Sequence, residues 1–317
     1  MSNLTIAIDA MGGDLGPAAV IEGAARAKEI FPEIEPVLFG AEDVLSAEMK
    51  KFTQMKIIHA PTVIHPNESP TLAFRRKKDS SIVMGLKYVK EGHAQGFVSS
   101  GSTGALLTGA TVIIGRKPGI ERPALSTILP TPAGYTLLMD IGANMDAKPS
   151  YLLQFAEMGA EYMQKCMGIA SPKIGLINVG TEEEKGNLLA KEAFVLLKSS
   201  GLNFVGNIEG REILAGGVDV AVCDGFTGNV VLKFTEGFAK TMMGMIKEEL
   251  MSSALSKIGA FMAKGAFKNL KKRFDYREVG GAPFLGLKQI VIKAHGSSDA
   301  LAIQNAIRQC VEFCRDK

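Results

Sequence analysis

The chain has 317 residues, of which 46% are hydrophobic and 22% are charged, and its formal net charge is +3. This is the composition of an ordinary globular protein, and so small a net charge gives no support to a nucleic-acid partner. The four cysteines, Cys166, Cys223, Cys310 and Cys314, form no C-x-x-C pair, so the sequence does not favour a zinc site.

The first residues, MSNLTIAIDAMGGD, lack the basic stretch and the long apolar run of a signal peptide. No segment approaches the roughly 18 consecutive apolar residues of a membrane span. We therefore expect a cytoplasmic protein.

Further along the chain, short apolar stretches are each followed by a glycine-containing polar loop and then by residues with helical apolar spacing. We expect strands at 4–9, 96–99, 136–140, 173–178, 219–223 and 289–293, and helices at 18–30, 105–114, from 150, 188–198, from 230 and at 300–313. This alternation predicts a mostly parallel sheet covered on both faces. Because ligands bind at the carboxyl ends of such strands, we expect the six loops to form a polar crevice at one edge of the sheet.

Two of the loops are similar to each other, SGSTG at 100–104 and DGFTG at 224–228. Glycine lets the backbone approach a ligand closely, and the free N–H groups at a helix start favour an anion. We expect the two loops to face one anionic ligand from opposite sides. Neither loop is a G-x-x-x-x-G-K-S/T phosphate loop, and residues 12–16 are not G-x-G-x-x-G, so local motifs do not support ATP or NAD.

Seven longer motifs occur in order between residues 6 and 299: IAIDAMGGDLGP, SSGSTGALLTGA, GIERPALSTILP, LMDIGANMDAKP, NVGTEEEKGN, CDGFTGNVVLK and GGAPFLGLKQIVIKAHGSSD. Together they resemble the bacterial phosphate acyltransferase family of phospholipid synthesis. Within A-G-N-T-G-A, the usual form of the second motif in that family, this chain has Ser100 for Ala and Ser102 for Asn.

The resemblance implies an α/β fold like that of isocitrate and isopropylmalate dehydrogenases, with three α/β/α layers and two domains around a central cleft. We expect residues 1–105 and 285–317 to form the first domain. Residues 106–284 would form the second domain, with a protruding amphipathic helical segment at about 251–274. The resemblance also implies a homodimer.

The activity implied by the resemblance is transfer of a fatty acyl group from acyl carrier protein to orthophosphate, which gives an acyl phosphate for phosphatidic acid synthesis. A membrane-bound glycerol-3-phosphate acyltransferase would use this product. No metal and no organic cofactor are implied.

Such a reaction needs groups that orient phosphate and stabilise an oxyanion. The resemblance implicates Lys185 in EEEKGN as catalytic, although spacing alone favours a solvated charge run. Asn229 in DGFTGN is the second catalytic candidate, with a helix cap as its alternative role. The candidates for phosphate or substrate binding are Asp9, Gly12, Gly13, Asp14, Gly101, Ser102, Thr103, Gly104, Asn144, Gly225, Thr227, Gly228 and His295.

Two basic segments are candidates for larger partners. The run Arg75–Lys78 is either a docking site for the acidic carrier protein or a solvated helix face. Residues 254–274 combine six Lys or Arg residues with bulky apolar ones and no acid, which is typical of binding to an anionic membrane surface. A dimer contact is the alternative for this segment. The expected membrane contacts are Leu255, Ile258, Phe261, Met262 and Phe267.

Three other functions are open at this point. A phosphotransacetylase acting on acyl-coenzyme A would use the same chemistry with another thiol. A dehydrogenase of the isopropylmalate type would need metal and nicotinamide sites, and no carboxylate cluster can be assigned to the metal. A non-enzymatic scaffold at the membrane would leave the six glycine-rich loops unexplained.

Overall fold

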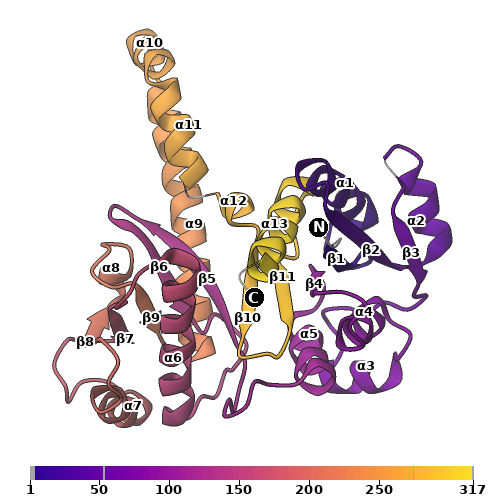
Figure 1. The fold of residues 1–317 in the computed structure, drawn as a ribbon. Helices are drawn as coiled ribbons and strands as arrows, with labels where there is room; N and C mark the ends of the chain where they lie inside the picture. The colour runs from indigo at the N-terminus through magenta and orange to yellow at the C-terminus, as the bar shows by residue number, and fades with distance from the viewer. Residues whose placement is uncertain (1–3, 53, 274, 316–317) are drawn as a thin grey trace.

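Figure 1 shows the computed structural model of the protein, which describes residues 4–52, 54–273 and 275–315. The strands are β1 Leu4–Asp9, β2 Ile34–Gly40, β3 Lys56–His59, β4 Gly96–Ser99, β5 Ala124–Thr131, β6 Gly134–Met139, β7 Ile174–Asn178, β8 Phe204–Glu209, β9 Val220–Val222, β10 Gly281–Leu285 and β11 Ile290–Ala294. The helices are α1 Gly16–Ile30, α2 Glu42–Met49, α3 Pro70–Arg76, α4 Ser81–Lys90, α5 Thr103–Gly109 continued by the π-helical turn Ala110–Ile114, α6 Pro149–Met167, α7 Leu188–Lys198, α8 Gly210–Ile213, α9 Gly225–Leu250, α10 Ala254–Met262, α11 Lys264–Arg273, α12 Tyr276–Val279 and α13 Ala300–Arg315.

The strands form one sheet in the order β3-β2-β1-β4-β11-β10-β5-β6-β9-β7-β8. All six predicted strands are present, and each of them pairs in parallel with another of the six. The helix predictions are confirmed as well, except that α9 begins at Gly225, five residues before the expected start.

Three antiparallel pairings separate the two parallel parts of the sheet. β10 is antiparallel to β11 and to β5, and β5 is antiparallel to β6. Strands β1, β4 and β11 therefore run opposite to β6, β9 and β7. The expectation that all six loops lie at one edge of the sheet is wrong, because an odd number of reversals places three loops at each edge.

Alternating side chains along the strands bury both faces of the sheet. In β1, Ile6 and Ile8 pack in a cluster with α1 and α13, whereas Ala7 packs in the cluster that contains α4 and α5. In β6, Leu137 packs in a cluster with α6 and α7, and Leu138 joins the cluster of Ala7. The result is helix, sheet and helix in three layers, and one core cluster contains residues of both predicted domains. The division into two domains stays a prediction.

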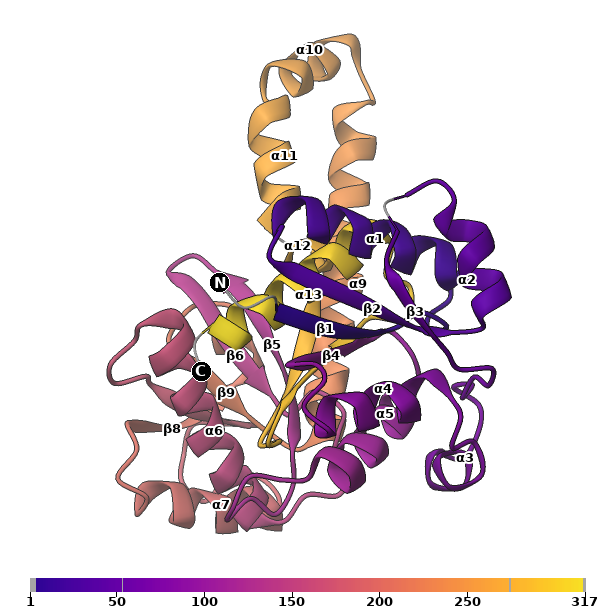
Figure 2. The ribbon, with the colours of Figure 1, turned by 45° about the vertical axis from the view of Figure 1, so that its right-hand side comes forward.

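An arm of helices projects from this body (Figures 1 and 2). It consists of the C-terminal part of α9 together with α10 and α11, and α10 contacts both of the others. Leu255, Phe261 and Met262 on α10 are 81%, 78% and 82% exposed. Ile258 is also exposed, and Phe267 on α11 is half-buried. Phe274, at the end of the predicted membrane segment, lies outside the described residues. No helix in the described part of the chain is long and apolar enough to cross a membrane.

Candidate active site

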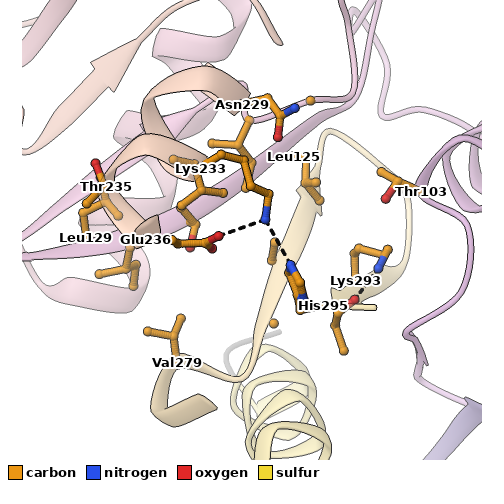
Figure 3. Close-up of a pocket in the computed structure, with 18 of the residues that line it drawn as sticks. Thr103, Leu125, Leu129, Asn229, Lys233, Thr235, Glu236, Val279, Lys293 and His295 are labelled. Carbon is orange, nitrogen blue, oxygen red and sulfur yellow. Dashed lines mark hydrogen bonds and ion pairs between the residues drawn. The ribbon is translucent and has the colours of Figure 1, made fainter. Parts of the chain in front are cut away.

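A cavity of about 640 Å³ lies between β5 and α9 on one side and the ends of β4 and β11 on the other. Figure 3 shows Asn229 and Lys233 reaching it from α9, and Thr103, Lys293 and His295 facing them. Leucine side chains of β5 and α9 form an apolar wall beside these polar groups. The cavity therefore combines a small polar cluster with an apolar lining, as binding sites for small molecules commonly do. Its apolar wall includes Leu125, Ile128, Leu129, Leu232 and Val279.

Lys233 and His295 join the two sides of the cavity. The Lys233 ammonium lies 3.0 Å from Nε2 of His295 and 2.9 Å from a carboxylate oxygen of Glu236. The other ring nitrogen, Nδ1, accepts from the backbone N–H of Ser297 at 3.2 Å and lies 2.8 Å from the Ser297 hydroxyl. Burial, followed by the charge of Lys233, lowers the pKa of His295.

Lys293 is a second cation at the same cavity, and its side chain is almost fully buried. Its ammonium donates to the carbonyl of Ala294 and, at 3.4 Å, to that of Ser100. Burial is the largest effect and lowers the pKa of Lys293 to about 8, while the carboxylates of Asp9 and Asp14 oppose the shift. A cation held by carbonyl groups inside the protein can still bind an anion that enters the cavity.

Asn229 lines the cavity, but it does not cap α9. The helix begins with Asp224, whose carboxylate accepts from the backbone N–H of Thr227 at 2.9 Å and from the Thr227 hydroxyl at 2.7 Å. Asn229 lies inside the helix, with its side chain 3.8 Å from the Cβ position that Gly142 lacks. The cap interpretation of Asn229 is therefore wrong, since its carboxamide lies beyond the helix start and faces the loop after β6.

Gly225 and Gly228 allow the start of α9 to pack closely against the loop after β6. A Cβ on Gly225 would lie 2.7 Å from the carbonyl oxygen of Asn144, and one on Gly228 would lie 1.8 Å from that of Asp140. Neither glycine nor Thr227 lines the cavity. The close approach that the sequence predicts is thus made to the protein's own backbone.

Asn144 is buried behind the cavity wall and organises the loop after β6. Its amide donates at 2.9 Å to the carboxylate of Asp140 and to the carbonyl of Pro123. The same carboxylate accepts from the backbone N–H groups of Leu125, Gly142, Ala143 and Asn144. Asp140 thereby positions Gly142 and Ala143, which line the cavity, and the Asn144 side chain is committed to the same network.

The loop after β1 packs behind Lys293 rather than lining the cavity. Ser99 donates to the carboxylate of Asp9 at 2.7 Å, and burial raises the pKa of Asp9. A Cβ on Gly12 would lie 2.5 Å from the backbone nitrogen of Gly101, and one on Gly13 would lie 2.7 Å from the Ser100 hydroxyl. The Asp14 N–H donates to the Gly296 carbonyl at 2.7 Å, which fixes one edge of the cavity.

The loop after β4 reaches the cavity through Thr103 and Gly104. Ser102 caps α5 by accepting from the Ala105 N–H at 3.4 Å. A Cβ on Gly104 would lie 2.6 Å from Pro70, so this glycine also allows α3 to pack against α5. Thr103 of the first of the two similar loops faces the cavity, and Asn229, which follows the second loop, faces it from the other side. That the two loops themselves bind one anion stays a prediction.

Lys185 lies in the loop between β7 and α7 and is exposed. Its backbone is fixed by two hydrogen bonds, one from its N–H to the Glu182 carbonyl and one from the Asn178 amide to its own carbonyl. Lys185 is not among the residues that line the cavity. The catalytic role implied by the resemblance stays a prediction.

The sequence reasoning missed Lys233, Glu236 and Lys293. Lys233 could have been found, because it follows Asn229 by four residues and so shares its helix face. Lys293 could not have been found in this way. It lies in an apolar strand, where the ammonium of a lysine is expected to reach solvent rather than stay buried.

The chain matches the family described as "Fatty acid synthesis protein" over residues 4–317. It is 53% identical over 316 residues to the phosphate acyltransferase of Clostridium beijerinckii, covering 98% of this chain and 95% of that protein. It is 51% identical over 315 residues to the phosphate acyltransferase of Clostridium perfringens strain SM101, covering 98% and 93%.

Among solved structures, a phosphotransacetylase from Streptococcus pyogenes is similar, with a TM-score of 0.67 and 19% identity over 99% of this chain and 95% of that one. A 4-hydroxythreonine-4-phosphate dehydrogenase from Klebsiella pneumoniae has a TM-score of 0.57 and 12% identity, covering 99% and 100%. These two structures share the fold, an α/β arrangement around a large central sheet. The sequence relatives show more, and this chain belongs to the fatty acid synthesis protein family as a bacterial phosphate acyltransferase.

Proposed function

We propose that the protein transfers a fatty acyl group from acyl carrier protein to orthophosphate and so forms an acyl phosphate for phosphatidic acid synthesis. The observation that carries this proposal is the cavity, where Lys233, Lys293 and Asn229 lie beside an apolar wall. Cations and an amide suit phosphate and an oxyanion, and the apolar wall suits the hydrocarbon next to the thioester.

In this reaction a phosphate oxygen attacks the carbonyl carbon of the thioester, and the carbonyl oxygen becomes an oxyanion. Collapse of this intermediate breaks the carbon–sulfur bond, and the departing thiolate takes a proton from water or phosphate. Lys233 would orient the phosphate, with its position set by Glu236 and His295. The Asn229 carboxamide would donate to phosphate or to the oxyanion.

Lys185 is assigned by resemblance to phosphate binding and charge stabilisation. Loss of one such donor typically lowers the rate by about 10²–10³. Lys185→Ala should therefore lose this much activity in a folded protein, whereas Lys191→Ala on the neighbouring helix α7 should not. Near-normal turnover of Lys185→Ala would return Lys185 to the role of a solvated charge.

The carrier protein is proposed to dock at the basic run Arg75–Lys78 on α3 and after it. Arg75, Arg76 and Lys78 are exposed, and α3 packs against Gly104 at the cavity. Lys77 is already paired with Glu68 at 2.7 Å and contributes less. Reversing the three exposed charges should raise the KM for the carrier thioester at low salt, with a smaller effect at high salt because exposed charges are screened.

The main alternative is a phosphotransacetylase that uses acyl-coenzyme A. The deciding experiment compares palmitoyl-carrier protein with palmitoyl-coenzyme A, each mixed with labelled phosphate, and measures the acid-labile acyl phosphate formed. We expect faster product formation from the carrier thioester, without added metal or nucleotide and without inhibition by a chelator. Preference for coenzyme A, or strict dependence on a divalent metal, would overturn the proposal.

The protein is further proposed to act as a homodimer that touches an anionic membrane through α10 and α11. The exposed apolar residues of α10 and the lysines of α11 support the membrane contact. A location at the bilayer would bring the acyl phosphate to the glycerol-3-phosphate acyltransferase that consumes it. A dimer would present two arms, and two weak contacts bind a surface better than one.

A further inference from the structure

A second cavity of about 860 Å³ lies next to the first one. The two cavities share three lining residues, Ile128 on β5, Arg273 at the end of α11 and Val279 at the end of α12. Ile128 packs with the core cluster of α6, whereas its neighbour Leu129 packs with the cluster of α4 and α5. Of the two cavities, Leu129 lines only the first, and Tyr162, which belongs to the cluster of Ile128, lines only the second. Adjacent residues of a strand point to opposite faces, so the two cavities extend over opposite faces of the sheet.

The sheet is split at the place where the cavities meet. β5 pairs with β10 only at Leu125 with Phe284 and at Ala124 with Leu285. Beyond these pairs, residues 127–130 of β5 and residues 279–282 both line the first cavity instead of bonding to each other as a ladder. Arg273 spans the top of the split, with its guanidinium donating to the Thr131 carbonyl at 2.8 Å.

The second cavity has an apolar floor and a charged rim. Tyr162 and Met167 of α6 and Phe313 of α13 line it, and the Tyr162 and Phe313 rings lie 5.6 Å apart. The rim cation Arg308 is already paired, since its guanidinium lies 2.9 Å from Glu312. Lys272, Glu278 and Arg315 are further charged residues of its rim. The proposed phosphate-binding cluster lies in the first cavity, so the apolar floor of the second one is the better surface for a long hydrocarbon.

We infer that the fatty acyl chain of the substrate passes from the first cavity through the split between β5 and β10 into the second cavity. This inference rests on the proposed function. The carbonyl end of the acyl chain would stay beside Lys233 and Asn229. Its methyl end would lie among Tyr162, Met167 and Phe313. Ile128 and Val279 flank the passage, so they determine which chain lengths the enzyme accepts.

The first test narrows the passage. Ile128→Trp and Val279→Trp should lower kcat/KM for palmitoyl thioester by about 10-fold or more relative to butyryl thioester. The larger side chains would leave too little space for the long acyl chain in the passage, whereas the short chain does not reach it. Val112→Trp, at an exposed position away from both cavities, is the matched control and should leave this ratio unchanged. An equal loss for both chain lengths, or no loss for palmitoyl, would contradict the passage.

The second test uses the unmodified protein and so does not depend on how variants fold. A palmitoyl-carrier thioester with a diazirine near the methyl end is bound, illuminated and mapped by mass spectrometry. We expect labels on α6 and α13 near Tyr162, Met167 and Phe313. Labels confined to the first cavity or to the arm, or no label in a protein that turns over palmitoyl thioester, would overturn the inference. Failure to turn over palmitoyl thioester at all would instead overturn the proposed function.

Discussion

Lys233 is the residue on which the proposed chemistry depends most, because its ammonium links α9 to His295 across the cavity. Replacing it with methionine keeps most of the side-chain volume and removes the charge. We expect Lys233→Met to lower kcat/KM for phosphate by about 10²–10³. Lys240→Met is the control, since Lys240 lies on the same helix, is exposed and does not line the cavity. Equal steady-state rates for the two variants would remove Lys233 from the mechanism.

The lowered pKa of Lys293 predicts how the stability of the protein depends on pH. Its pKa in the folded protein, about 8, is below the ordinary value of 10.5, so between these pH values the unfolded chain binds the extra proton. Stability then rises with pH in this range. Relative to Lys293→Met, the wild-type protein should gain on the order of 2 kcal/mol in the free energy of unfolding between about pH 7 and pH 9.5. Urea denaturation at both pH values measures the gain, and a constant difference would show that Lys293 titrates normally.

At the scale of an element, the start of α9 contains one residue with a structural role, Asp224, and one with a proposed functional role, Asn229. Asp224→Ala removes the cap of the helix and the partner of the Thr227 hydroxyl, and should cost about 1–2 kcal/mol of stability. Asn229→Ala removes no cap, so it should lower activity while leaving the melting temperature close to that of the wild type. Calorimetry and turnover measured on both variants check this, and the opposite pattern would restore the cap interpretation.

The arm makes the second prediction at this scale. A glutamate on the exposed apolar face of α10 would oppose insertion among anionic lipid headgroups. Leu255→Glu and Phe261→Glu should therefore abolish flotation with anionic liposomes. Val195→Glu is the control, because Val195 on α7 is 65% exposed and lies outside the arm. If the arm variants still float as well as the control, the membrane contact lies elsewhere.

At the scale of the whole molecule, α9 has an apolar stripe on the face opposite the cavity. The residues follow each other at spacings of four and three, which places them on one side of a helix. Phe234 and Phe238 stack at 6.0 Å between ring centroids. So long an exposed stripe fits a second copy of the chain, the expected homodimer. The stripe is Phe226, Val230, Phe234, Phe238, Met242 and Met245.

The dimer can be tested through this stripe. Light scattering should give the wild-type protein twice the 33.8 kDa of one chain. Phe234→Lys combined with Phe238→Lys should give the mass of one chain, because it buries two charges at the contact. The same pair of changes at Val195 and Leu188, exposed on α7, should leave the dimer intact. A dimer that survives the first pair would place the contact on another face.

The sequence by itself determined the local elements and the family. Apolar periodicity located six of the nine strands that pair in parallel, because strand and helix periods depend only on neighbours in the chain. It did not locate β2, β3 and β8. Motifs such as CDGFTGN identified the family, whereas the close approach to a ligand that was predicted for Gly225 and Gly228 is made to the protein's own backbone. What they approach could not be read from the chain, because their partners, Asn144 and Asp140, are about eighty residues away.

Tertiary structure alone decided the direction of the sheet and the content of the site. The strands β5 and β10 reverse the sheet, and pairing between strands far apart in sequence has no local signal. Lys293 was expected at the surface, but burial makes it a cation beside the cavity. The fold also brings His295 within 3.0 Å of Lys233, which is 62 residues away in the chain. The physical reason is that the burial of a residue, the pKa of its side chain and the partner of its strand depend on the atoms around it. Distant parts of the chain supply most of these atoms.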